Sequence, residues 1–166
     1  MLTKISNEIK RLILKNNSSV TYFASGQVGV ANNIMSDIEP SAKKIFESDK
    51  YRKMDIIDIN NNIAVFALGN SDYHKAIKLL ETNLELSKEL VCTSHKSLLV
   101  IANNLAIGHY LKGDYKKANI IMKMLFSNFR EKWQIGKHTN PAYVLNYIMI
   151  LTKNELYTEA KLMNKK

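Results

Sequence analysis

The sequence predicts an all-α protein, built as a right-handed superhelix of stacked antiparallel helix hairpins. Among its 166 residues only 6 are Gly and 2 are Pro, so few positions would interrupt a helix. Apolar side chains recur at steps of three and four residues, which is the spacing of one helix face. Three residue types also recur every 42 residues, and such a period is typical of tandem structural repeats.

The 42-residue period is carried by tyrosine, alanine and asparagine. In each copy the alanine follows the tyrosine by three residues, and the asparagine precedes it by eleven. Because one helix pair cannot bury both of its faces, neighbouring copies must stack on one another. The recurring residues are Tyr73, Tyr115 and Tyr157, then Ala76, Ala118 and Ala160, and finally Asn62, Asn104 and Asn146.

Each copy is predicted to contain two helices joined by a tight turn. In the middle copy the first helix ends at Gly113, because glycine accepts the left-handed conformation that follows many helices. Asp114 is placed to cap the second helix, and the small Ala118 lets that helix approach the first closely. In the third copy Glu155 stands where the glycine belongs. The inward stripe of the first helix is formed by Leu98, Ala102, Leu105 and His109.

The same reasoning predicts six helices in the last two thirds of the chain. Asn140 and Pro141 are expected to start the fifth of them, with asparagine as the cap and proline in the first helical position. The last helix keeps several apolar residues, Leu162 among them, and this predicts that it packs on a second copy or on a partner, or that it belonged to a longer chain. The expected ranges are 55–68, 72–90, 96–111, 115–131, 141–152 and 155–164.

Residues 1–53 follow the period poorly. Apolar residues at helical spacing predict an amphipathic helix from residue 2 to residue 16. A break is expected at Ser25–Gly26, and a boundary at Glu39–Pro40. One interpretation of this segment is a degenerate or capping helical repeat.

The other interpretation of the N-terminal segment is a DNA-binding helix-turn-helix. Its recognition helix would follow a turn at Gly29 and would present asparagine and serine but no Lys or Arg. Asp37 and Glu39 on that helix would repel the phosphates of DNA. The repeat interpretation is therefore favoured.

Composition and charge favour a soluble cytoplasmic protein. The formal net charge is +9, but the basic residues are spread along the chain without the long run that is typical of nucleic-acid-binding tails. A single cysteine excludes an intramolecular disulfide. No apolar run approaches the ~20 residues of a membrane span, and the first residues do not resemble a signal peptide.

Residues that could carry out catalysis or hold a metal are not arranged for it. The four histidines lack the spacing of metal ligands. The glycines at 26 and 29 are not followed by the lysine of a phosphate-binding loop. Because no nucleophile, base and orienting group come together, we expect no enzyme activity, no metal and no cofactor.

The pattern N-L-A…G-D-Y-x-x-A, which runs here from Asn104 to Ala118, resembles the tetratricopeptide repeat. Its period is longer than the usual ~34 residues and is similar to the 42-residue variant of kinesin light chain. The resemblance implies three repeats over 54–166, at about 54–94, 95–136 and 137–166. It leaves 1–53 as an N-terminal helical segment.

This resemblance implies a non-enzymatic module that binds a peptide or protein in a concave groove lined by the first helices. Similar repeats occur in bacterial peptide-sensing regulators of the Rgg, PlcR and Rap type, so a bacterial regulatory or sensing protein is expected. A homo-oligomer is left open. The alternative is a DNA-binding regulator with an N-terminal helix-turn-helix and a repeat-type effector domain.

The candidate ligand-binding residues lie on the first helices. Asparagine amides can bond the backbone of an extended peptide whatever its side chains. Asn103 and Tyr110 are seven residues apart and share a stripe that we expect to be partly open in the groove. For Asn62, Asn104 and Asn146, a role in tying neighbouring helices together is an equal alternative. The full set is Asn61, Asn62, Asn103, Asn104, Tyr110 and Asn146.

Overall fold

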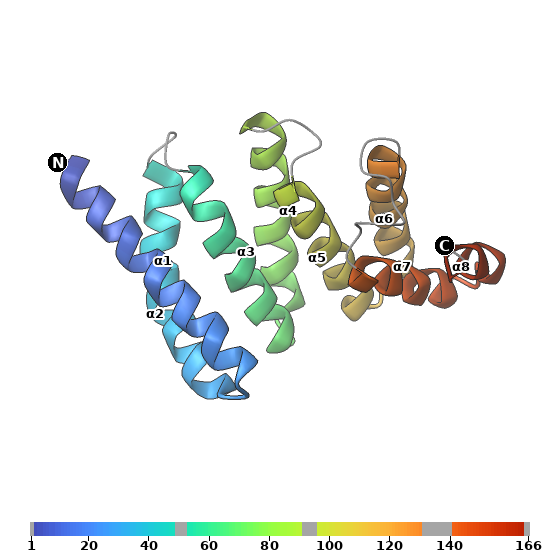
Figure 1. Ribbon diagram of the computed structural model, residues 1–166, viewed down its shortest axis with the longest axis horizontal. Helices are drawn as coiled ribbons and strands as arrows, with labels where there is room; N and C mark the ends of the chain where they lie inside the picture. The colour runs from blue at the N-terminus through green and yellow to red at the C-terminus, as the bar shows by residue number, and fades with distance from the viewer. Residues whose placement is uncertain (1, 49–52, 91–95, 131–140, 165–166) are drawn as a thin grey trace. The chain divides into compact units, whose positions relative to one another are not determined.

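The computed structural model describes residues 2–48, 53–90, 96–130 and 141–164. These residues form α-helices (Figure 1). The helices are α1 (Leu2–Ala24), α2 (Val28–Ser48), α3 (Lys53–Gly69), α4 (Tyr73–Leu90), α5 (Lys96–Lys112), α6 (Tyr115–Arg130), α7 (Pro141–Lys153) and α8 (Tyr157–Asn164).

The six helices predicted for the last two thirds of the chain are confirmed. Every bound of α3 to α8 lies within two residues of its expected position. α7 starts at Pro141 as expected. The break at Ser25–Gly26 is also confirmed, because α1 ends at Ala24 and α2 begins at Val28.

The predicted boundary at Glu39–Pro40 is wrong, because Pro40 lies inside α2. Its side chain is exposed, while Ile38 and Ala42 on either side of it are 1% and 0% exposed. A proline inside a helix costs about 3 kcal/mol, and each buried isoleucine contributes roughly 1.5–3 kcal/mol. Burial of the stripe that includes Ile38 and Ile45 outweighs the missing hydrogen bond.

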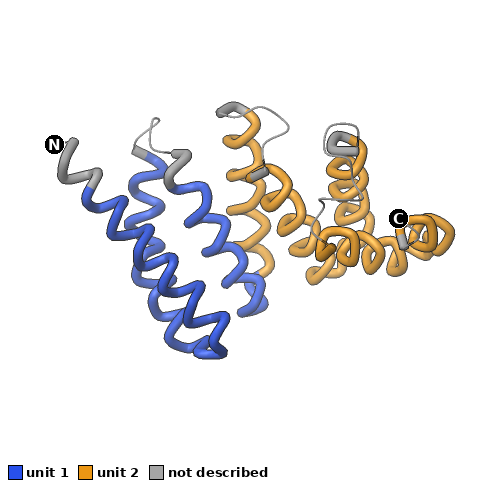
Figure 2. Tube along the Cα trace, viewed as in Figure 1, with its two compact units in different colours: residues 1–72 blue, residues 73–166 orange. Residues whose placement is uncertain are grey.

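The chain forms two compact units, residues 1–72 and 73–166 (Figure 2). In the first unit, α1 and α2 form an antiparallel hairpin, and α3 packs against both of them. In the second unit each helix from α4 to α8 packs on the next, and α5 also contacts α7.

The core of each unit is built from small and apolar residues that face a neighbouring helix. In the first unit the rings of Phe23 and Phe66 meet edge to face, with centroids 5.0 Å apart. In the second, Phe126 stacks on Tyr147 at 4.9 Å. The recurring alanine is buried in every copy, as predicted. Its exposed fractions are 0% at Ala76, 0% at Ala118 and 7% at Ala160.

Among the described residues, four turns between helices share one backbone geometry. In the turn after α5, the amide of Gly113 bonds the carbonyl of Tyr110, and the amide of Asp114 bonds that of His109. This pair of bonds defines the Schellman motif. The same pair recurs in the turns after α1, α3 and α7. At the equivalent place each turn has a residue with positive φ, namely Gly26 (81°), Ser71 (63°), Gly113 (91°) and Glu155 (61°).

Apolar residues in and just before α8 divide between the core and the surface. Ala160 belongs to the core of the second unit, and Leu156 and Met163 pack against that core. Tyr157 and Leu162 stay 57% and 59% exposed. The interaction predicted for this end of the chain would therefore depend on these two exposed side chains.

Candidate interaction surface

An asparagine pair links α5 to α7 in the second unit. The Nδ2 of Asn146 donates to the Oδ1 of Asn103 at 3.1 Å, and the Nδ2 of Asn103 donates to the Oδ1 of Asn104 at 3.3 Å. Asn103 is only 5% exposed. A buried amide must find partners for its polar atoms, and Asn146 supplies one of them.

The same arrangement links α1 to α3 in the first unit. The Nδ2 of Asn62 donates to the Oδ1 of Asn16 at 3.1 Å, and the Nδ2 of Asn16 lies 3.4 Å from the Oδ1 of Asn17. In both units an asparagine on the first helix of one repeat thus bonds an asparagine on the first helix of the preceding repeat. This supports the alternative in which these asparagines tie helices together.

Asn16 and Asn17 were missed as members of this pattern. They precede Asn61 and Asn62 by 45 residues instead of 42, so a search at one fixed period passes over them. The repeated Asn-Asn dipeptide was the signal that could have found them.

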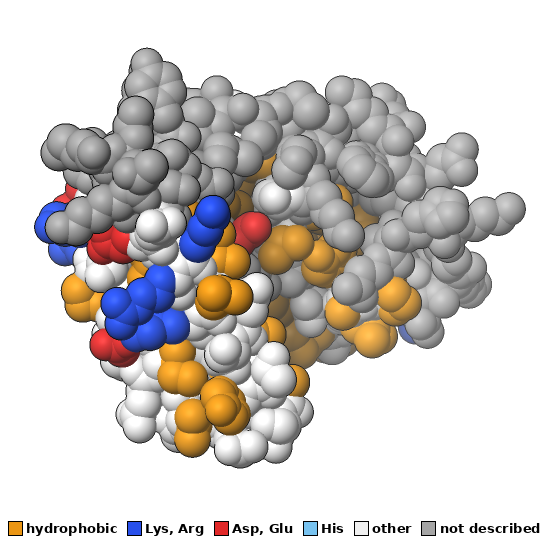
Figure 3. Space-filling model, turned by 60° about the vertical axis from the view of Figure 1, so that its left-hand side comes forward, with side chains coloured by type: hydrophobic (Ala, Val, Ile, Leu, Met, Phe, Trp, Pro, Cys, Tyr) orange, Lys and Arg blue, Asp and Glu red, His pale blue; other side chains and the backbone are white. Residues whose placement is uncertain are grey.

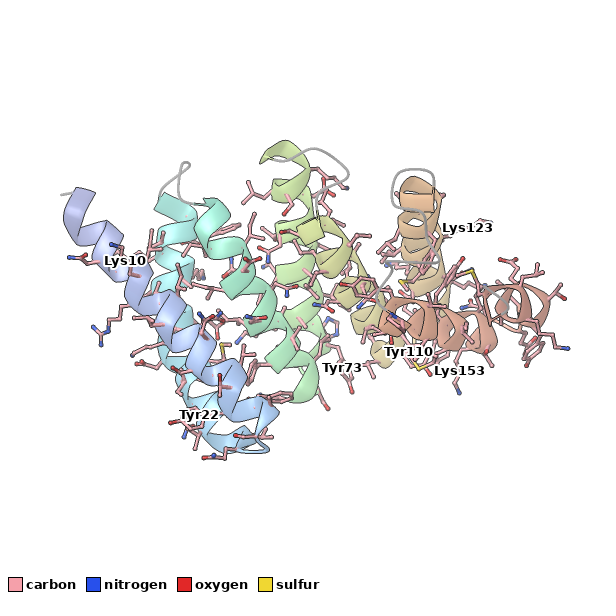
Figure 4. The ribbon with its side chains drawn as sticks, in the orientation of Figure 1. Lys10, Tyr22, Tyr73, Tyr110, Lys123 and Lys153 are labelled. Carbon is pink, nitrogen blue, oxygen red and sulfur yellow. The ribbon has the colours of Figure 1, made fainter. Side chains whose placement is uncertain are left out.

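The expectation that Asn103 is open to a groove is wrong. Adjacent residues of a helix point about 100° apart, and this turns Asn103 toward α7 and leaves Asn104 half-buried beside it. Tyr110 shares the stripe of Asn103 and is half-buried, packing against the core of the second unit and lying 5.4 Å from the ring of Tyr115 (Figure 4). The shared stripe is confirmed, but it faces a neighbouring helix.

The other candidates divide between the two units. Asn61 is 8% exposed and Asn62 is half-buried, both in the first unit. Asn104 and Asn146 are half-buried in the second unit.

Apolar side chains lie beside the asparagines in the second unit and were not among the predicted site residues. Ile107 and Leu111 follow Asn104 by three and seven residues, and Met149 follows Asn146 by three, so each lies on the same helix face as its asparagine. Leu111 is 44% and Met149 37% exposed. We call the residues Asn104, Ile107, Leu111, Asn146 and Met149 the open face of α5 and α7. Ile107 and Met149 are themselves 42 residues apart, which was a usable signal.

His109 lies among charged groups without forming a catalytic arrangement. It is 4% exposed, and its Nδ1 is 3.6 Å from the Oδ2 of Asp114 while its Nε2 is 4.0 Å from the Oε1 of Glu81. Burial lowers the pKa of His109 more than any other cause, and the two carboxylates oppose this effect. Its position on the inward stripe of α5 is the predicted one.

A shallow pocket of about 400 Å³ lies where the turn after α5 meets the turn after α7. Its wall is held by Asn154, whose Nδ2 donates to the carbonyl of Tyr115 at 2.9 Å. Asp114 and Glu155 line it together with Lys116 and Lys153. Charges of both signs at one rim favour no particular class of ligand.

Within the described ranges, no cluster of three or more His, Cys, Asp or Glu residues is arranged to hold a metal ion. In the same ranges no helix has the length and the apolar character that crossing a membrane requires.

The helix-turn-helix alternative is not supported. Gly29 is the second residue of α2, and that helix continues without a turn to Ser48. The hairpin of α1 and α2 closes with the same turn as the later hairpins, at Gly26. A turn at Gly29 followed by a separate recognition helix does not exist.

Comparison with known proteins places these helices in one fold. The tetratricopeptide repeat family model matches residues 55–131, which span α3 to α6. The crystal structure of kinesin light chain nearly identical TPR-like repeats from Podosopora anserina has a TM-score of 0.75, and that of a variant of these repeats 0.78. Both are 16% identical, and each match covers 93% of this chain and 72% of the other.

A third solved structure, BtubC (BKLC) from P. vanneervenii, has a TM-score of 0.74 at 17% identity. The match covers 92% of this chain and 59% of the other. No curated protein matches the chain. These likenesses show an all-α fold of the tetratricopeptide type, as the sequence predicts.

Proposed function

We propose that this protein is a non-enzymatic interaction module that binds a peptide or a protein segment on its first helices. It would act in the cytoplasm as part of a bacterial regulatory or sensing protein, with repeats at about 54–94, 95–136 and 137–166 after an N-terminal segment 1–53. The observation that carries the proposal is the open face of α5 and α7, where apolar side chains accompany half-buried amides.

The chemistry of the open face suits an extended segment of low charge. Leu111 and Met149 offer apolar contact area to the side chains of a ligand. Asn104 and Asn146 lie beside them with amides that can both donate and accept hydrogen bonds. Such amides recognise a peptide backbone, while the apolar side chains select what the peptide carries.

The buried asparagines have a supporting role in this proposal. Asn103 holds the side chain of Asn146 in position, and Asn61 is the corresponding residue of the first unit. Tyr110 packs behind the face and stiffens it. Asn104 and Asn146 remain the proposed polar contacts with a ligand in the second unit, and Asn62 remains one in the first unit.

The test uses a phage-displayed library of random 12-residue peptides selected on the intact chain. Peptides that are enriched are then titrated by calorimetry against the wild type and the double variant Leu111→Ser, Met149→Ser. Each lost apolar contact weakens binding by roughly 1 kcal/mol, so the affinity should fall by about tenfold or more.

The matched control is the double variant Ile120→Ser, Met124→Ser. These residues are 58% and 56% exposed on α6, so the substitutions remove similar surface away from the open face. Two results would rule out binding at the open face. One is an equal loss of affinity in both double variants, and the other is an unchanged affinity of the selected peptides for the variant Leu111→Ser, Met149→Ser.

A further inference from the structure

The outer side of α1 carries apolar residues that no described helix covers. Leu14 is 68%, Val20 43% and Ile13 37% exposed, and Asn17 and Thr21 lie exposed among them. These five residues fall at helical spacing on one side of α1, which we call the outer stripe. Figure 3 shows hydrophobic side chains open to solvent on this side of the molecule, near a group of Lys and Arg side chains.

Two residues of the outer stripe, Leu14 and Thr21, correspond to Ile59 and Phe66, which are buried in α3. The two asparagine pairs fix the correspondence, since Asn17 aligns with Asn62 and Leu14 then aligns with Ile59. Ile59 is only 1% exposed, and Asn62 bonds the preceding first helix through Asn16. The outer stripe therefore has the composition of a helix-packing surface, although it is open.

The tip of the first hairpin is free of charge. No charged residue occurs between Asn16 and Ser36, in a chain of which 23% is charged. The ion pair of Lys15 with Asp37 joins α1 to α2 just outside this stretch. Depletion of charge around apolar groups is typical of the core of a protein–protein interface. Asn17 in the middle of the stripe favours a protein over lipid, because lipid would offer no acceptor to its Nδ2.

A second copy stacked head to tail does not fit the outer stripe. At the other end of the repeat pattern, Leu145 occupies the position of Asn16, Asn61 and Asn103, and it is 63% exposed. The amide of Asn17 would meet this leucine instead of an acceptor. Burying a donor without an acceptor is unfavourable, so the two ends do not complement each other.

We propose that the outer stripe is the interface of a symmetric dimer, in which two α1 helices pack antiparallel about a two-fold axis beside Asn17. Each copy then presents the same patch to the other, as such symmetry requires. Asn17 faces Asn17 of the second copy, and each amide can donate one bond and accept one. The Oδ1 of Asn17 has room for this bond beside the one from Asn16, because a carbonyl oxygen accepts two.

The antiparallel register also pairs the remaining residues of the stripe. Leu14 faces Val20 of the second copy, and the apolar contact occurs twice. Lys10 lies opposite the carboxyl end of the other α1, where a cation is favoured by the helix dipole. The two Lys10 residues are then about 21 Å apart along the axis, more than two screening lengths in physiological salt. Their repulsion is therefore small.

The dimer is tested by sedimentation equilibrium of the intact chain over a range of concentrations up to about 200 μM, which detects dissociation constants in the micromolar range. A reversible monomer–dimer equilibrium is expected. Leu14→Glu should raise the dissociation constant at least tenfold, because it places two carboxylates in the contact. Met124→Glu, at a residue 56% exposed on α6, should leave it unchanged. Circular dichroism checks that both variants remain helical.

Cross-linking tests the register independently. In a Cys92→Ser background, Asn17→Cys should form a disulfide-linked dimer on oxidation, because the two sulfurs would meet on the axis. Lys10→Cys should not form such a disulfide, because the helix rise places the two residues at position 10 about 21 Å apart.

Several results would overturn the proposal. These are a chain that stays monomeric at the highest concentration, oligomers that keep growing with concentration, and a dimer that Leu162→Glu disrupts but Leu14→Glu does not. A dimer in which Asn17→Cys fails to cross-link would refute the antiparallel register.

Discussion

Two of the described residues that carry a side chain adopt a backbone conformation that favours glycine. Ser71 and Glu155 have φ values of 63° and 61°. Each occupies the position in its own turn that Gly113, with a φ of 91°, occupies in the turn after α5. The left-handed region costs a residue with a side chain about 1–2 kcal/mol. The two Schellman bonds of each turn hold these residues there.

Replacing Glu155 by glycine should therefore stabilise the protein. The relief of strain exceeds the entropy that glycine loses on folding, for a net gain of about 0.5–1 kcal/mol and a rise in Tm of about 1–4 °C. Thermal unfolding followed by circular dichroism measures the change in Tm.

The converse substitution, Gly113→Ala, should cost about 1 kcal/mol through the backbone alone, because no atom lies within 4 Å of the added Cβ. A lower Tm for Glu155→Gly would mean that the turn needs the glutamate.

His109 should make stability depend on pH. Burial lowers its pKa below the ordinary value of 6.5, helped by Lys117 and Lys112 and opposed by Asp114 and Glu81. The unfolded chain then binds more protons than the folded one as the pH falls through 6.5. Its contribution to stability is thus fully present above that pH and is lost as the pH falls through the folded-state pKa.

Urea unfolding at about pH 7.5 and about pH 5.5 measures this effect. The wild type should lose more free energy of unfolding between the two values than the variant His109→Gln, which cannot be protonated. If the variant shows the same loss, other groups cause the pH dependence.

At the scale of the helix, Asn62 bonds Asn16 and Asn146 bonds Asn103, and each bond joins one first helix to the preceding one in the same unit. Asn103→Ala should leave the Nδ2 of Asn146 without its acceptor at 3.1 Å and cost about 1–3 kcal/mol. In a double-mutant cycle with Asn146→Ala, the two changes should couple by more than about 0.5 kcal/mol. Urea unfolding gives the free energy of unfolding of the wild type, of the two single variants and of the double variant. Asn33→Ala, at an exposed site on α2, is the control, and additive effects at 103 and 146 would contradict the bond.

The recurring alanine sets how closely the helices of a hairpin approach. Ala118 is 0% exposed within the core of the second unit, so Ala118→Trp should overpack it and cost about 1–3 kcal/mol or more. Ile120→Trp, two residues along and 58% exposed, should change the Tm little. An unchanged Tm for Ala118→Trp would mean that α6 is free to move away from its neighbours.

The sequence predicted the helices of the repeat well because period, turn and apolar stripe all depend on neighbouring residues. It did not show how far α1 extends. Asn17 and Ser18 are poor helix formers, and α1 nevertheless continues to Ala24, since Ser19 is buried and its hydroxyl donates to the carbonyl of Ala31. That contact joins residues of two helices and cannot be found in a local pattern.

The candidate site was predicted less well, for a similar reason. An Asn-Asn dipeptide places two amides about 100° apart, and only the position of the next helix decides which of them is buried. The structure buries Asn103 and leaves Asn104 half-buried. The apolar Leu111 and Met149 beside them were overlooked because attention was given to polar residues alone.

At the scale of the whole chain, the turns and asparagine pairs are shared by both compact units. In a repeat protein each copy interacts with its neighbours only, so stability is close to a sum of local terms. The bond between Asn146 and Asn103 is one such term. A copy added in phase should therefore bring its own neighbour interactions and leave the others intact.

The prediction is that the chain accepts a 42-residue duplication. A second copy of Asn103–Val144 inserted after Val144 places the new asparagine pair where Leu145 and Asn146 stand. The new second asparagine can then bond the original Asn103, and Asn146 can bond the new first asparagine. The ellipticity per residue at 222 nm should stay unchanged, and the Tm should not fall. Inserting the 40-residue segment Leu105–Val144 instead omits the asparagine pair and rotates the inserted copy of Leu105–Lys112 by about 200° relative to the preceding Pro141–Val144. This would turn the copies of Leu105 and Ala106, which are 4% and 0% exposed in α5, away from the core and should lower the Tm sharply. If both insertions are tolerated equally, the 42-residue period does not determine how these helices pack.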